Sequence, residues 1–126
     1  MAFFSFTKAI LEGKPIDVFN RGRMRRDFTY VTDIVAGVLS ALDHNYPYEI
    51  FNLGNSQTVS LGRFISAIES ALGKKAIRRM RPMQPGDVPA TWADIKKSTR
   101  LLGFRPTTDI QTGIRQFAQW YRSYFV

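Results

Sequence analysis

Apolar residues recur at helical spacing in five segments of the chain. The clearest stripe lies between Ser60, a good N-cap residue, and Gly73, a good helix stop. Helices are predicted at 3–11, 32–43, 61–72 and 94–102, with a last one after Thr108. Asp33 and Asp94 are expected at helix starts, and Thr108 with Gln111 has the spacing of a capping box.

Short apolar and β-branched runs predict strands at 16–19, 26–30, 48–53 and 76–80. The segment 20–22 is predicted as a turn, and three prolines with Gly86 make 82–89 a loop. About five helices and four or five short strands follow one another without a β-α-β-α series. The fold class is therefore α+β (a small α/β fold), in one domain covering 1–126.

The net charge of +8 favours anionic partners, and twelve of the eighteen basic residues are arginine. Guanidinium groups recognise phosphate or carboxylate through paired hydrogen bonds. A solvated basic face is the alternative explanation. The absence of cysteine and the single histidine exclude thiolate and multi-histidine metal sites.

No apolar run approaches the roughly 20 residues of a membrane span, and the N-terminus lacks the order of a signal peptide. We expect a soluble, cytoplasmic protein that binds no membrane.

Residues 14–31 carry the most informative chemistry of the chain. They predict two strands around a glycine-containing turn, with Phe19 ending the first strand and an arginine-rich run opening the second. The aromatic ring can offer one nucleotide base a flat apolar face, and the arginine-rich run can offer one phosphate a fixed cation. We expect the ring and one arginine of the run to line one side of a shared cleft.

Catalytic signatures are missing from the sequence. There is no Gly-x-Gly-x-x-Gly spacing for a dinucleotide pyrophosphate and no tyrosine followed four residues later by lysine. The carboxylates form no evident acid/base pair. We therefore expect no catalysis by this chain alone.

Five separated motifs resemble the extended short-chain dehydrogenase/reductase family, and within it the NAD-dependent UDP-glucuronate 4-epimerases of polysaccharide synthesis. They are Lys14-Pro15-Ile16-Asp17-Val18-Phe19-Asn20, Arg26-Asp27-Phe28-Thr29-Tyr30-Val31-x-Asp33-Ile34-Val35, Phe51-Asn52-Leu53-Gly54-Asn55, Gln84-Pro85-Gly86-Asp87-Val88-Pro89-x-Thr91-x-Ala93-Asp94, and Leu102-Gly103-Phe104-x-Pro106. The resemblance covers essentially the whole chain.

The resemblance implies the C-terminal, substrate-binding part of such an epimerase. The Rossmann domain with its glycine fingerprint and Tyr-x-x-x-Lys pair is expected to be absent. The chain would then be a truncated piece, a proteolytic fragment or a degenerate gene product. NAD serves the complete family protein, which oxidises the sugar at C4 and returns hydride to the other face; we expect no cofactor on this chain alone.

The resemblance also assigns substrate-binding residues. It implies that Arg26 binds the UDP-sugar diphosphate and that Phe19 lies against the uracil. Asn52, at the end of a predicted strand, is implied near the diphosphate.

In the proline-rich loop, Gln84 and Asp87 are implied to face the uridine. Relatives acting on other sugars often carry arginine where Gln84 stands, and Arg81 is a candidate to compensate. For each of these residues the alternative is an ordinary packing, capping or surface role.

Two functions of other classes remain open. A basic nucleic-acid-binding module would need its arginines on one face with exposed aromatics, and no such motif is found. A fragment without ligand would only self-associate. In the family the missing Rossmann domain packs against this part, so we expect an exposed apolar surface that a homodimer would cover.

Overall fold

Five α-helices and five short strands make up the computed structural model, which describes residues 1–126. The helices are α1 (Ala2–Leu11), α2 (Val31–His44), α3 (Leu61–Leu72), α4 (Lys96–Leu102) and α5 (Ile110–Phe125). The strands are β1 (Pro15–Phe19), β2 (Arg25–Asp27), β3 (Thr58–Ser60), β4 (Ile77–Arg81) and β5 (Ala90–Thr91), and the 3-10 turn η1 (Asn20–Gly22) joins β1 to β2. The predicted α+β class is confirmed.

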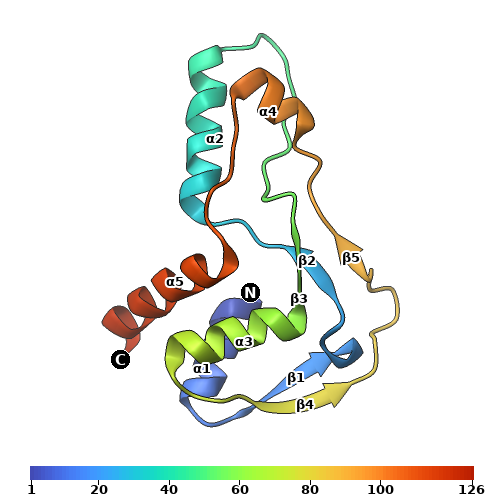
Figure 1. Cartoon of the computed structure of the whole chain (residues 1–126), viewed down its shortest axis with the longest axis vertical. Coiled ribbons are helices and arrows are strands. Elements are labelled where there is room, and N and C mark those ends of the chain that lie inside the picture. Colours follow the sequence, from blue (N-terminus) through green and yellow to red (C-terminus); the bar gives the residue numbers. More distant parts are fainter.

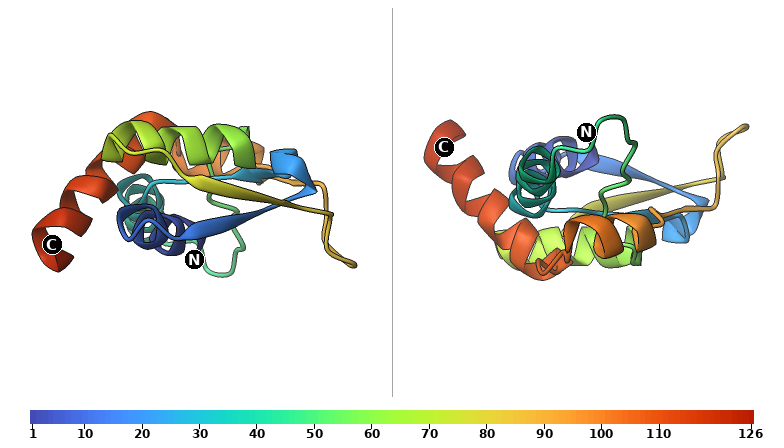
Figure 2. Two further views of the ribbon diagram at one scale, coloured as in Figure 1. Left: turned by 90° about the horizontal axis from the view of Figure 1, so that it is seen from below. Right: turned by 90° about the horizontal axis from the view of Figure 1, so that it is seen from above.

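The elements divide into a body and an arm (Figure 1). The body contains α1, α3, α5, β1 and β4, and the arm contains α2 and α4, which lie side by side. The strands β2, β3 and β5 lie between the two. Viewed along the long axis, α1 and α2 lie on one side of the strands, and α3 and α4 lie on the other (Figure 2).

Two small sheets organise the strands. In the first, β1 and β4 are parallel, and Phe19 is paired with Arg81. In the second, β2 is central, antiparallel to β3 and parallel to β5. Because β2 has neighbours on both sides, its backbone is the best-fixed part of this sheet.

The apolar core is built around α3. Phe64, Ile65 and Ile68 are fully buried, and α1, α5 and β1 pack around them. Both predicted ends of α3 are confirmed. At its start the Ser60 hydroxyl accepts a hydrogen bond from the Arg63 N–H, and at its end Gly73 has a left-handed φ of 66°.

The second predicted strand is shorter than expected, and Phe28 explains why. Its ring stacks on that of Phe64, with centroids 4.3 Å apart and planes 3° from parallel. The chain therefore turns toward the core directly after Asp27, and Tyr30 is already the N-cap residue of α2. The strands β3 and β5, of three and two residues, were not predicted.

The arm is joined to the rest of the molecule through one face of α2. The buried Asp33 carboxylate accepts hydrogen bonds from the Thr108 N–H at 3.0 Å and the Thr107 hydroxyl at 3.4 Å. Gly37 is buried because Leu53 and Phe104 pack directly on it; a Cβ there would lie 2.8 Å from Leu53.

Some predictions of local structure were wrong. Residues 48–53 form no strand, because no other segment pairs with them. The capping box of Thr108 and Gln111 does not form; Asp109 is the N-cap residue instead and accepts the Thr112 N–H at 2.7 Å.

Helix α4 begins at Lys96 and not at Asp94, although the Asp94 carboxylate does accept the Lys96 N–H. No helix of the structure has both the length and the apolar character that crossing a membrane requires.

A buried carboxylate ties α3 to β4. Glu69 accepts hydrogen bonds from the Ala76 N–H and from Arg78, both at 2.9 Å, while Lys75 lies at 3.6 Å. Burial alone would raise the pKa of Glu69, but these hydrogen bonds and the two positive charges outweigh it and lower the pKa.

We predict that Glu69→Gln lowers the free energy of unfolding by about 1–3 kcal/mol at neutral pH, because the charged hydrogen bonds at a buried position are lost. A lowered folded-state pKa gives stability that is complete above the unfolded-state value of 4.5 and is lost as the pH falls through the folded-state pKa. In denaturant unfolding, the difference in stability between the two proteins should therefore begin to shrink as the pH falls below about 4.5 and vanish below the folded-state pKa of Glu69. The exposed Glu12→Gln serves as the control and should change little at neutral pH.

Candidate functional site

The predicted strand–turn–strand segment is present. The turn passes through three consecutive left-handed residues, with φ of 48° at Asn20, 51° at Arg21 and 77° at Gly22. Gly22 is buried against α3, and a Cβ there would lie 3.3 Å from the Gly62 nitrogen. A glycine is therefore required at this position, and the turn fixes how β1 leads into β2.

Arg26 lies on the central strand β2, between Val59 of β3 and Thr91 of β5. Its Nη1 donates to the main-chain carbonyls of Arg25 and Val88, each at 2.8 Å, and its Nη2 donates to the Asp87 carboxylate at 3.0 Å. The side chains of Arg26 and Asp87 are about one-third exposed. The guanidinium is thus held in place beside the proline-rich loop.

The proline-rich loop contains a tight turn at 84–87. The Asp87 N–H donates to the Gln84 carbonyl at 3.2 Å, and Gly86 has a φ of 79°. Proline in the second position and a left-handed glycine in the third are typical of a type II turn. The turn brings Asp87 to Arg26 and leaves Gln84 exposed.

Phe19 and Arg81 are neighbours across the parallel pair β1–β4. Phe19 is half-buried. The Arg81 guanidinium is engaged with Asp17 at 3.1 Å, and Arg79 contacts the same carboxylate at 2.6 Å. Hydrogen bonds from Arg79 and then Arg81 lower the pKa of Asp17. Arg81 would have to leave this ion pair to bind a ligand.

Asn52 stands apart from the other predicted site residues. It is exposed, and only its main-chain carbonyl is bonded, by the Ser98 hydroxyl of α4. Since 48–53 forms no strand, the expectation that Asn52 ends one was wrong. The contacts bring together Arg26, Asp87 and Gln84 along the loop, and Phe19 with Arg81 at the sheet, while Asn52 joins neither pair.

Asp27, to which the sequence pattern assigned no role, organises the same region. Its carboxylate accepts three main-chain hydrogen bonds, from Asn55 and Ser56 at 2.9 Å each and from Ala93 at 3.0 Å. Gly54 packs so closely beside it that a Cβ would lie 2.5 Å from the Ala93 Cβ. An acidic residue directly after Arg26 in a quoted motif was the available signal.

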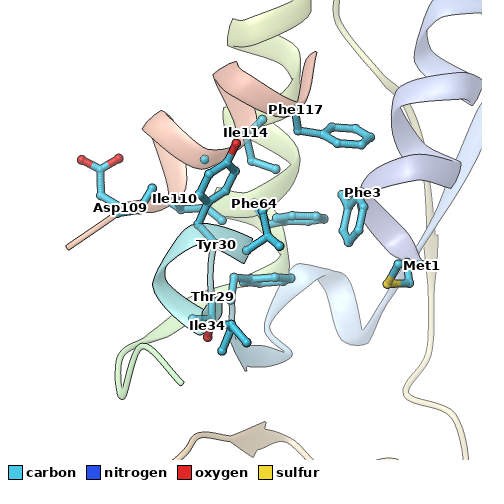
Figure 3. A pocket seen from close by; sticks show the side chains of 14 residues that line it. Met1, Phe3, Thr29, Tyr30, Ile34, Phe64, Asp109, Ile110, Ile114 and Phe117 are labelled. Atoms are coloured by element: carbon cyan, nitrogen blue, oxygen red, sulfur yellow. The ribbon is translucent and has the colours of Figure 1, made fainter. Parts of the chain in front are cut away.

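Two well-formed hollows lie elsewhere in the structure. A cavity of about 470 Å³ opens among α1, α2, α3 and α5, with Phe3, Phe64 and Phe117 around it (Figure 3). A second, polar hollow of about 460 Å³ is lined by residues that include Trp92, Lys96 and Arg100. None of the six predicted site residues lines either one. No group of three metal-ligating side chains occurs in the structure.

The chemistry available around Arg26 is binding. The guanidinium is fixed by three acceptors, and the half-buried Phe19 ends β1, the preceding strand, which belongs to the other sheet. The site can therefore hold an anion.

Comparison with known proteins agrees with this chemistry. Residues 1–54 match the model of the NAD dependent epimerase/dehydratase family. Over these residues the chain is similar to this family, in agreement with the resemblance of the motifs.

Within the family, the chain is similar to UDP-glucuronate 4-epimerases. It is 42% identical to UDP-glucuronate 4-epimerase 1 of Arabidopsis thaliana over 99% of the chain and 33% of that protein. An uncharacterized protein of Methanocaldococcus jannaschii is 51% identical over 96% of the chain and 37% of that protein.

Among solved structures, UDP-glucuronic acid 4-epimerase of Bacillus cereus, in complex with UDP-glucuronic acid and NAD, matches with a TM-score of 0.90 and 33% identity. The match covers 99% of this chain and 40% of that one. Across the curated relatives the chain spans between 32% and 43% of their length. It therefore corresponds to less than half of a family protein.

We predict that Arg26→Ala frees the proline-rich loop, because Val88 and Asp87 lose their anchor on β2. Amide hydrogen exchange at Asp87 and Val88 should accelerate by tenfold or more, on the order of the 1.5–3 kcal/mol of a charged hydrogen bond. Arg26→Lys keeps the positive charge but lacks the planar guanidinium that donates to several acceptors at once, and should give an intermediate rate of amide exchange. Unchanged exchange in Arg26→Ala would show that the loop is held by other contacts.

Proposed function

We propose that this chain is the nucleotide-sugar-holding part of an NAD-dependent epimerase, with UDP-glucuronate as the substrate. The match to the epimerase/dehydratase family model and the similarity to UDP-glucuronate 4-epimerases support the class of substrate. Because the chain spans less than half of those relatives, the complete activity needs the remaining part of such a protein.

The proposal depends on one observation: the Arg26 guanidinium is held in place by hydrogen bonds and still has unused N–H donors. Three of its N–H groups are bonded within the chain, while Nε–H and the second Nη2–H make no hydrogen bond there. An arginine held by its surroundings, with donors to spare and a one-third exposed side chain, is suited to a phosphate. The diphosphate is the most highly charged part of a UDP-sugar.

The remaining assignments follow from position. Phe19 ends β1, so its ring can lie against the uracil, while Gln84 and Asp87 on the type II turn can meet the ribose. Arg81 would reach the diphosphate only by leaving Asp17. Asn52 remains assigned to the diphosphate by resemblance alone.

NAD does not fit this chain. Dinucleotide sites bring a glycine-rich backbone against the pyrophosphate, and no such spacing occurs in the sequence. No tyrosine of the chain is followed four residues later by lysine either. We therefore assign NAD and the catalytic groups to the remainder of the family protein and propose that this chain binds and orients substrate only.

We predict weak UDP binding by the chain, measured by calorimetry at two ionic strengths. Arg26→Ala should weaken it about tenfold or more, and Phe19→Ala by a similar factor, from a loss of roughly 1–3 kcal/mol each. The control Arg115→Ala removes an exposed arginine from α5 and should bind like the unaltered chain. Equal losses in all three variants would contradict the assignment.

Calorimetric titrations at two ionic strengths also distinguish UDP-sugar binding from the alternative function, nucleic-acid binding. A nucleic-acid-binding module should lose affinity for single-stranded DNA or RNA steeply with salt. The proposal instead expects UDP affinity to depend on Phe19 more than on ionic strength. Nucleic-acid binding that is tighter than UDP binding and insensitive to Phe19 would favour the module.

We also predict no turnover by the chain alone. When the chain is incubated with NAD and UDP-glucuronate, chromatography of the nucleotide sugars should detect no UDP-galacturonate. Product formed without another protein would contradict the assignment of the catalytic groups. The cytoplasmic location and a homodimer stay predictions.

A further inference from the structure

The polar hollow lies where β5 leads into α4 (Figure 1). Its volume of about 460 Å³ falls within the range of small-molecule sites, roughly 300–1,000 Å³. Only two of its seven lining residues, Trp92 and Ile95, are apolar, and the others carry a charge or a hydroxyl group. None of the residues assigned to UDP-sugar binding lines it, so its chemistry is still without a role.

Asp27 fixes the backbone at two places along the wall of this hollow. Its carboxylate accepts the Ser56 N–H at 2.9 Å and the Ala93 N–H at 3.0 Å. Ser56 lines the hollow with a left-handed φ of 57°, and Ala93 stands between two further lining residues, Trp92 and Asp94. The wall is therefore ordered by folding, which lowers the cost of binding a ligand there.

Trp92 gives the hollow an apolar surface. It is 63% exposed, although tryptophan is highly buried on average. An indole so open to water contributes little to the fold, but it offers a ligand a large flat face. The C–H groups of a sugar ring gather on one face of the ring, and that face has the shape to pack on an indole.

Two cations of α4 line the hollow without partners. Lys96 and Arg100 are four residues apart, so they lie on the same side of the helix. Neither forms an ion pair within the chain, whereas Lys97 between them pairs with Glu49. Because like charges at this spacing destabilise a helix, an anionic ligand explains the two cations better than the fold does.

The other polar groups of the hollow select the kind of anion. The Asp94 carboxylate accepts the Lys96 N–H and has a second oxygen for another donor. Ser56 adds a hydroxyl group, and the Thr99 hydroxyl, which donates to the Phe104 carbonyl at 3.1 Å, can still accept. A carboxylate repels a chain of phosphates such as a nucleic acid, but it accepts hydrogen bonds from the hydroxyl groups of a sugar.

We propose that this hollow binds a sugar that carries one anionic group, either a carboxylate or a phosphate. Trp92 packs on the sugar ring, Arg100 and Lys96 bind the anionic group, and Asp94 accepts hydrogen bonds from the sugar hydroxyl groups. A guanidinium bonds carboxylate and phosphate with the same fork, so both kinds of acidic sugar fit. The site is separate from the one around Arg26 and goes beyond the proposed function.

The two tryptophans of the chain, Trp92 and Trp120, provide a probe and an internal control. Their indole N–H signals are followed by NMR while the chain is titrated separately with D-glucuronate, D-glucose 6-phosphate and neutral D-glucose; Trp92→Phe assigns the signals. We expect the Trp92 signal to shift with at least one charged sugar, and that sugar identifies the anionic group. Glucose should bind about tenfold more weakly or less, and the Trp120 signal should stay in place.

Two variants test the assigned contacts. Arg100→Ala should weaken binding of the charged sugar about tenfold or more, while the control Arg115→Ala, which removes an exposed arginine of α5, should bind like the unaltered chain. Asp94→Asn keeps an acceptor for the Lys96 N–H and should weaken sugar binding severalfold. A simple anion site would instead bind more tightly once the carboxylate is gone. Circular dichroism checks that each variant is folded.

The proposal is overturned if neither charged sugar shifts the Trp92 signal, if glucose binds equally well, or if both tryptophan signals move together. Tighter binding of the charged sugar by Asp94→Asn also overturns it. So does tighter binding of a glutamate-rich peptide, which would indicate an acidic protein partner. Phe19→Ala should weaken UDP binding and leave these titrations unchanged, so the two proposals can fail independently.

Discussion

The anchoring of Arg26 at the centre of a three-stranded sheet is the constraint on which the candidate site depends. A strand of only three residues is held on both sides, by β3 and by β5, and so its side chains start from a fixed backbone. The guanidinium in turn fixes the proline-rich loop through its hydrogen bonds to Val88 and Asp87. An arginine on a mobile loop would lose much of its binding energy to ordering; this one has already been ordered by folding.

The two regions of the molecule differ in how they are stabilised. The body contains nearly all of the fully buried apolar side chains, gathered on α3. The arm has few, and polar contacts such as those of Asp33 and Ser98 hold it to its surroundings. Local opening should therefore begin in the arm, where the exposed aliphatic side chains of α2 gain nothing from burial in the isolated chain.

Local signals in the sequence predicted the parts of the fold that local interactions determine. Helix α3 was clear because its cap, its apolar stripe and its glycine stop agree, and the turn at 20–22 was clear because glycine allows it. The strands β3 and β5 could not be predicted, since strands of two or three residues have no detectable period and exist only by pairing with β2. Residues 48–53 show the opposite case, a β-prone run for which this chain offers no partner.

For the site, resemblance supplied the residues, and the structure adds their connections. Arg26 and Asp87 are 61 positions apart, so their ion pair could not be read from spacing. The same holds for Asp27, whose three bonds join segments 28, 29 and 66 positions away. Those bonds restrict which side chains position 27 accepts. Asparagine would offer one acceptor oxygen where two are used. Glutamate is longer by one methylene, which would move the carboxylate into the space that Gly54 and Ala93 already fill. Few positions of the chain should be as intolerant of chemically similar replacements, although this one touches no substrate in the proposed arrangement.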